Sequence, residues 1–354
     1  QWYFNSGHPK LTTISDYSAT TKKVKVIVRQ DASKLFEFPF AIDIVENGKT
    51  TRQQVWVPKQ AETIFEFTAN QKPDVVIPNA DQVLLCDLDD KKSVDEFIAQ
   101  YKAGKGNYTT RLLAVEAMAN AQATNPKAAE ALIEALNDSF DGIRIDAIHK
   151  IDAKSKPMMD KAVNKLKQLA TNDPKTLVQA AALSSLNEAN IYDATIFEKA
   201  SKSPSFSVQG AALTGILQNN PAKINELTTI SDDVVKGSPD LAMALVPTWM
   251  KNNQLDKAEL ISESAAMYEF VKFQDPEKGK IAEQAFNWIM TNDTPEATAA
   301  VAKTYSRYYT YLKEQNPMAG TAIKQMATKA LQLKTEAGKT IKSARFSKQI
   351  EQLT

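Results

Sequence analysis

Hydrophobic and polar residues alternate along the first part of the chain, from residue 11 to about residue 88. Apolar side chains occupy every second position in the runs 23–29 and 35–45. Because successive side chains of a strand point to opposite faces, this period predicts half-buried β-strands. Pro39 interrupts the second run and indicates an edge position or a bulge, since proline cannot donate to a ladder.

A turn and several shorter runs extend this pattern. Asn47 and Gly48 form an Asn-Gly pair, which is a strong indication of a two-residue hairpin. Further apolar runs recur at intervals typical of a small all-β domain, about 8 to 12 residues apart, namely 54–57, 63–67, 75–77 and 82–86. The sequence therefore predicts an antiparallel β-sandwich over residues 10–90.

The alternation ends at the charged run 87–92, which we interpret as a solvated linker. Ser93 and Glu96 are spaced as a capping box at the start of a helix. From there the apolar residues follow a helical period, and a helical domain of about 14 to 18 helices is predicted over residues 91–354. Prolines are expected at helix starts, at Pro126, Pro174, Pro204, Pro221, Pro276, Pro295 and Pro317.

An internal repeat runs through the first part of the helical region. Four nine-residue segments align with one another, beginning at residues 110, 143, 178 and 208. The fifth position of each segment is alanine, and the sixth and ninth positions are apolar. A small residue between larger apolar ones lets a neighbouring helix approach closely, so these alanines are predicted to be buried in stacked helical hairpins, namely Ala114, Ala147, Ala182 and Ala212.

Polar residues recur in the same repeat. The second position holds Arg111, Arg144, Gln179 and Gln209, while Asp138 and Asp173 each lie six residues before that position. This pattern resembles the HEAT repeat, in which an aspartate before the second helix and an arginine on it form a ladder along the stack. We interpret the six residues as hydrogen-bonding groups between repeats, and the alternative is that they line a surface that contacts peptides.

Composition and charge narrow the classes of protein. The chain has 354 residues, enough for two or three domains, and its hydrophobic content of 43% and charged content of 24% are those of an average globular protein. The net charge of +1 provides no basic excess, so nucleic-acid binding is not expected. No apolar stretch reaches the roughly 18 residues of a membrane span.

Candidate catalytic groups are scarce. His8 and His149 are the two histidines, and they have no paired spacing for a zinc site or a nucleophile–base pair. Cys86 lies in an apolar run, where a buried hydrophobe is favoured over a reactive thiol. With 11 glycines and no phosphate-binding loop, the sequence indicates no catalytic residue, metal ligand or cofactor site in this chain.

A tyrosine-rich segment near the end of the chain offers a different kind of surface. Val301, Tyr305, Tyr308 and Leu312 fall on one face of a predicted helix, which Tyr309 and Tyr311 widen. Packing against another helix with phenol groups at the rim is favoured. The alternative is that this face forms a wall of a groove for a peptide or a partner.

The first nine residues differ in pattern from the predicted strands that follow. Trp2 to Asn5 resembles the tail of a helix, with a stop at Gly7 and a proline at Pro9. We expect residues 1–9 to be the end of a preceding domain, and the chain to be a piece of a longer protein.

The order of the predicted domains and several short segments resemble the C-terminal half of the aminopeptidase N family of zinc metallopeptidases, the gluzincins. In that family the catalytic domain ends in Trp-x-x-Gln-x-Gly-x-Pro, which Trp2, Gly7 and Pro9 fit, with Asn5 in place of the glutamine. Segments of the predicted sandwich also resemble those of the family, namely Phe40-Ala41-Ile42, Val55-Trp56-Val57, Lys72-Pro73-Asp74 and Val83-Leu84-Leu85.

The resemblance implies that this chain is a non-catalytic accessory region. The zinc and its ligands would lie upstream, in the catalytic domain of the parent, and no catalytic residue carries over to this sequence. The helical domain would pack over the catalytic cleft and limit access to short peptides, so the expected partners are the upstream domain and peptide substrates. The alternative is a free-standing α-solenoid that binds a partner protein. The sequence assigns no compartment and no substrate.

Overall fold

The computed structural model describes residues 7–31, 34–104, 106–227, 230–267 and 276–340. The predicted helix tail at the start of the chain lies outside these residues, apart from Gly7 to Pro9, which are not helical. Contacts between residues divide the chain into two compact units, Gln1–Leu166 and Lys167–Thr354.

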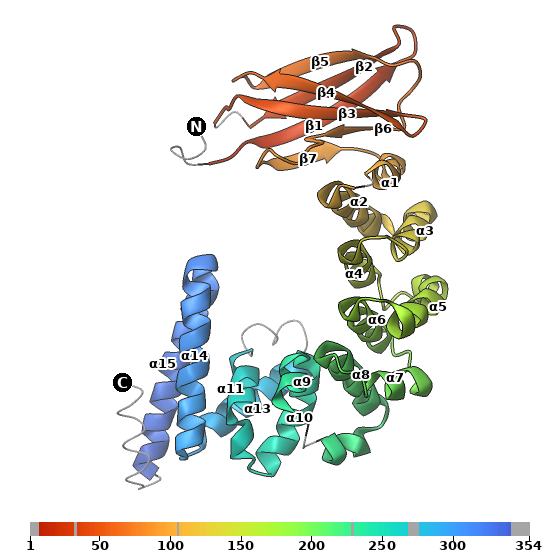
Figure 1. Ribbon diagram of the computed structural model, residues 1–354. Coiled ribbons are helices and arrows are strands. Elements are labelled where there is room, and N and C mark those ends of the chain that lie inside the picture. The colour runs from red at the N-terminus through yellow and green to blue at the C-terminus, as the bar shows by residue number, and fades with distance from the viewer. Residues whose placement is uncertain (1–6, 32–33, 105, 228–229, 268–275, 341–354) are drawn as a thin grey trace. The chain divides into compact units, whose positions relative to one another are not determined.

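The first unit begins with seven strands in two sheets, shown as stacked arrows in Figure 1. The four-stranded sheet has the order β5-β2-β1-β7, and the three-stranded sheet has the order β4-β3-β6. The strands are β1 (Lys10–Ser18), β2 (Lys23–Gln30), β3 (Phe38–Glu46), β4 (Lys49–Val57), β5 (Glu62–Thr68), β6 (Val75–Pro78) and β7 (Asp87–Lys91). All strand pairs are antiparallel except β1 with β7.

The core of the sandwich follows the period-two pattern. Val24, Val26 and Val28 of β2 point inward and are at most 1% exposed. Strand β3 is buried on both faces, because its other face packs with β6 against the first helix, where Ala41 and Val45 contact Ala99 and Ala103. This double burial explains why β3 has apolar residues on both faces, while its charged residue Asp43 is paired with Arg52.

The hairpin prediction is confirmed. Asn47 and Gly48 both have positive φ angles, 51° and 72°, as a tight turn with a right-handed strand twist requires. Pro39 lies in the middle strand of its sheet and not at the sheet's edge. It is tolerated because β6 pairs with Ile42 to Val45 and does not reach Pro39.

Two strand assignments from the sequence are wrong. The run 82–86 is not a strand, and the charged run 87–92, expected to be a solvated linker, provides strand β7. Strand β7 pairs in parallel with β1, and Thr13 donates a hydrogen bond to Asp90 at 2.8 Å. The side chain of Lys92 is 1% exposed and forms an ion pair with Asp90. Because the two charges are paired, both side chains can be buried at this end of the sandwich.

Five helices follow the sandwich in chain order. They are α1 (Val94–Ala103), α2 (Tyr108–Ala121), α3 (Pro126–Ala135), α4 (Asp141–Lys150) and α5 (Lys156–Asn172), whose end belongs to the second unit. The capping box is confirmed, since the Ser93 hydroxyl accepts from the Glu96 amide and the Glu96 carboxylate accepts from the Ser93 amide at 2.7 Å.

The described part of the second unit continues with helices. Its α-helices are α6 (Thr176–Glu188), α7 (Ala194–Ala200), α8 (Phe206–Asn219), α9 (Asp232–Lys236), α10 (Pro239–Lys251), α11 (Ala258–Ala266), α13 (Pro276–Thr291), α14 (Pro295–Gln315) and α15 (Pro317–Thr340). The described residues thus hold 14 α-helices and the 3-10 turns Pro221–Leu227 and Leu255–Lys257. The expected β-then-α architecture is confirmed.

The prediction that prolines lie at helix starts is confirmed in part. Four of them are the first residue of an α-helix, at Pro126, Pro276, Pro295 and Pro317. Pro221 starts a 3-10 turn, and Pro174 and Pro204 each lie two residues before their helix. In those two cases the residues between the proline and the helix form a turn around a side-chain hydrogen bond, described below.

The four repeat alanines are each 0% exposed. They lie on α2, α4, α6 and α8, at the same position of each aligned segment. Because an alanine side chain adds little bulk, the next helix can approach closely at that point. The prediction that these alanines are buried at equivalent positions is confirmed.

Candidate functional sites

A buried carboxylate, Asp138, lies at the centre of a polar cluster in the first unit. The Tyr101 hydroxyl donates to it at 2.9 Å, the Phe140 amide donates at 2.8 Å, and the Arg111 guanidinium forms an ion pair with it. Arg144 donates to the backbone carbonyl of Asp138 at 2.8 Å. Burial and the bond to this carboxylate raise the pKa of Tyr101, so the phenol remains a donor.

The same local geometry recurs one repeat later. Asp173 accepts from the Lys175 amide at 2.9 Å, as Asp138 accepts from Phe140. Gln179 donates to the Asp173 carbonyl at 2.6 Å, as Arg144 donates to that of Asp138. In both repeats the aspartate carboxylate therefore accepts from the backbone amide two residues later and forms a turn. The side chain six residues later donates to the backbone carbonyl of the aspartate. Glutamine can replace arginine in this bond because only one N–H donor is needed.

The fourth repeat uses a serine at the same place. Ser203 lies six residues before Gln209, and its hydroxyl accepts from the Ser205 amide at 3.2 Å. We did not identify Ser203 from the sequence, although the six-residue offset of Asp138 and Asp173 would have found it. The Gln209 side chain makes no hydrogen bond within the described residues, so the ladder is incomplete in this repeat.

These contacts favour a structural interpretation of the ladder. The two oxygens of Asp138 already accept from three groups, which occupies most of the hydrogen-bonding capacity of this buried carboxylate. Arg111 and Arg144 are each 8% exposed. A guanidinium this deeply buried positions helices instead of contacting a ligand in solution.

The two histidines lie in different parts of the chain and have different surroundings. His8 is within 2.9 Å of Asp87 in an exposed pair, and His149 is exposed on α4. The described residues contain no group of three or more histidine, cysteine, aspartate and glutamate side chains that could hold a metal ion. In the same part of the chain, no helix combines the length and apolar character needed to cross a bilayer.

Cys86 is half-buried against the sandwich core. Burial, with a smaller contribution from the negative charge of Asp87, raises the pKa of its thiol to about 11. At neutral pH the thiol is therefore protonated, and this state agrees with the interpretation of Cys86 as a buried hydrophobe.

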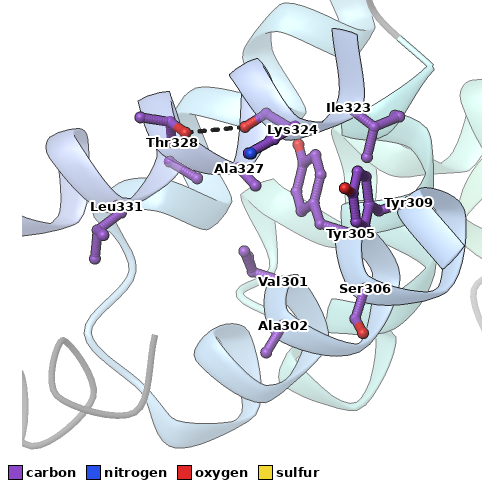
Figure 2. A pocket seen from close by; sticks show the side chains of 11 residues that line it. Val301, Ala302, Tyr305, Ser306, Tyr309, Ile323, Lys324, Ala327, Thr328 and Leu331 are labelled. Atoms are coloured by element: carbon purple, nitrogen blue, oxygen red, sulfur yellow. Dashed lines mark hydrogen bonds between the residues drawn. The ribbon is translucent and has the colours of Figure 1, made fainter. Parts of the chain in front are cut away.

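The tyrosine-rich segment is helix α14, and it packs against α15. Val301 and Tyr305 are buried, while Tyr309 and Tyr311 are 39% and 60% exposed. A cavity of about 370 Å³ lies between the two helices, and Figure 2 shows Tyr305 and Tyr309 at one end of it and Leu331 at the other. One part of this face therefore packs against another helix, and another part lines the cavity.

A comparison with protein families finds that a model of HEAT repeats matches residues 88–187. No curated protein matches this chain. Among solved structures, the chain is similar to the crystal structure of Legionella pneumophila aminopeptidase A in complex with aspartic acid, with a TM-score of 0.50 and 12% sequence identity.

That likeness covers 99% of this chain and 49% of the aminopeptidase. The chain therefore spans about half the length of this structural neighbour. The two comparisons support a helical repeat module that follows a β-sandwich, in the order seen here.

Proposed function

We propose that this chain is the non-catalytic C-terminal region of a zinc aminopeptidase of the gluzincin type. In this proposal it packs over the catalytic cleft of its parent and limits the access of peptides. The observation that carries the proposal is the extent of the structural likeness, which includes both the sandwich and the helices and yet accounts for half of an aminopeptidase.

The chemistry of the chain supports an accessory role. The zinc of such an enzyme would be held by an upstream domain, because the two histidines of this chain are His8, paired with Asp87, and His149 on α4. Stacked helical repeats present an extended concave surface, and a surface of this kind is suited to cover a cleft.

An exposed apolar pair supports contact with an upstream domain. Val83 and Leu85 are 79% and 76% exposed, whereas Leu84 between them packs on the sandwich core. They lead into β7, where the Asp87 amide donates to the Pro9 carbonyl at 3.0 Å. The pair therefore lies near the point where the chain enters the sandwich, and it would be covered by the domain that precedes it.

The test begins with the coding sequence upstream of Gln1, which the proposal expects to encode a His-Glu-x-x-His domain in frame. The product of the whole reading frame should bind zinc and cleave aminoacyl anilides. The 354-residue chain alone should do neither after dialysis. Stoichiometric zinc and measurable turnover in the isolated chain would contradict the proposal.

A second candidate is a free-standing interaction module, favoured by an exposed aromatic pair. Tyr108 and Phe140, 39% and 43% exposed, meet edge to face with 5.3 Å between ring centroids. Exposed aromatic rings are frequent at protein interfaces. An upstream reading frame without a peptidase domain would favour this function over the first.

A further inference from the structure

The cavity between α14 and α15 has a mainly apolar lining with a few polar groups. Most of its wall is apolar, and the volume of about 370 Å³ is within the range of small-molecule sites. The lining residues are Val301, Ala302, Tyr305, Ser306 and Tyr309 of α14, with Ile323, Lys324, Ala327, Thr328, Ala330 and Leu331 of α15.

One polar group in this wall has no partner. Tyr305 is 4% exposed, and its buried hydroxyl makes no hydrogen bond in the part of the chain that the structure describes. Buried polar groups are nearly always paired, and an unpaired one costs free energy. Burial raises the pKa of Tyr305, so the group is a protonated donor that lacks an acceptor.

The charge of the lining is of one sign. Lys324 is the only charged residue among the described residues of the lining. Its side chain is exposed, and it forms no ion pair with any of them or with another described residue. The Thr328 hydroxyl already has a partner, since it donates a hydrogen bond to the Lys324 carbonyl at 3.0 Å (Figure 2). The cavity therefore has a phenol donor and an ammonium group, and none of the described residues that line it has a carboxylate.

A second cavity in the same unit shows the contrast. It is lined by Asp240 and Glu263 as well as by Lys236 and Lys278. The Lys278 ammonium lies 2.8 Å from Asp240, so the charges of that cavity are compensated within the protein. The cavity at Tyr305 differs because its charge is not compensated.

We propose that the cavity between α14 and α15 binds a small carboxylate with an aliphatic body. The carboxylate would accept from the Tyr305 hydroxyl and lie near the Lys324 ammonium, and the aliphatic body would extend along Val301 toward Leu331. A charged acceptor makes the strongest hydrogen bond available to a buried phenol. This site is independent of the proposed accessory function.

The test is a calorimetric titration of the whole chain with decanoate, decanol and decyltrimethylammonium. These probes share one aliphatic chain and differ in head group. Decanoate should bind most tightly and the cation most weakly. Tyr305→Phe should weaken decanoate about ten-fold, as for a hydrogen bond to a charged group, and leave decanol unchanged. Lys324→Gln should weaken decanoate by about two- to five-fold.

Two controls separate the site from a general charge effect. Lys313→Gln removes an exposed lysine of α14 that does not line the cavity, and it should leave decanoate binding unchanged. Thermal unfolding of each variant checks that it is folded. Equal affinity for decanoate and decanol, or an unchanged affinity in Tyr305→Phe, would overturn the proposal.

The other possible occupant is the end of the chain itself. A chain that ends after Thr340 provides this arm of the test. If decanoate binds to the shortened chain and not to the whole chain, then residues 341–354 occupy the cavity and the proposal is overturned. Binding to both chains with the same preference for the carboxylate supports it.

Discussion

Asp138 and Tyr305 are both buried polar residues of the helical region, and their surroundings differ. Asp138 accepts from Tyr101, Arg111 and Phe140, whereas the Tyr305 hydroxyl has no partner among the described residues and lies beside a cavity. The difference separates structural from binding roles, because a satisfied buried group fixes a fold while an unsatisfied one has capacity left for a ligand.

The largest expected effect is the loss of a partner from the satisfied cluster. Arg111→Met leaves the Asp138 carboxylate buried without its counter-charge, which costs about 3–5 kcal/mol of unfolding free energy. Tyr101→Phe removes one hydrogen bond and should cost about 1 kcal/mol. Urea denaturation measures both values. A cost for Arg111→Met as small as that for Tyr101→Phe would show that the charge is solvated.

A buried lysine in the second unit tests how strongly burial disfavours a charge. Lys334 is 0% exposed and donates to the Asn292 carbonyl at 2.9 Å. Burial lowers its pKa to about 8, from a usual value of 10.5. Between these values the unfolded chain binds more protons at this site, so the contribution of Lys334 to stability rises with pH across the window.

This pH dependence is measured as a difference between two proteins. The unfolding free energy of the wild type minus that of Lys334→Met should rise between pH 8 and pH 10.5 with a slope of up to about 1.4 kcal/mol per pH unit. Below pH 8 the difference should be constant. A difference that stays flat from pH 7 to pH 11 would mean that the ammonium is solvated in the folded state.

The repeat alanines test the packing around the satisfied cluster. Ala147 is 0% exposed on α4, and Ala147→Leu should overpack the stack at a cost of about 1–3 kcal/mol. Ala299→Leu, at an exposed position on α14 that does not line the cavity, is the matched control and should have little effect. If the two variants were equally stable, close helix approach at the alanine would not be required.

The smallest expected effect is a gain in stability. Tyr305→Phe removes a buried hydroxyl without a partner, so the unfolding free energy should rise by up to about 1 kcal/mol in the absence of ligand. A matched change at Tyr309, which is 39% exposed, should be close to neutral. A loss of stability in Tyr305→Phe would reveal a hydrogen bond and weaken the contrast with Asp138.

The sequence predicted the features that depend on local period and repetition. The Asn47-Gly48 hairpin, the capping box at Ser93 and the buried repeat alanines all follow from residues close together in the chain or from an offset that recurs. The offset of six residues also singled out Asp138 and Asp173, although it predicted bonds between repeats and not the turns that these residues form.

Features that depend on distant partners were missed. Strand β7 has charged residues, and it pairs with β1, where Thr13 binds Asp90 although the two are far apart in the sequence. Hydrophobic periodicity cannot detect a strand of this kind, nor the burial of Lys92 by its ion pair with Asp90. The cavity beside Tyr305 was also invisible, since it depends on how α15 packs against α14.

The most direct measurement of the proposed accessory role compares peptide length profiles. The product of the whole reading frame is compared with a truncation that ends after Gly104, which retains α1 because that helix covers Ala41 and Val45 of the sandwich. Circular dichroism and zinc content establish that the truncated protein is folded and loaded. The account predicts that the truncation cleaves long peptides that the whole protein excludes. Identical length profiles for the two proteins would contradict it.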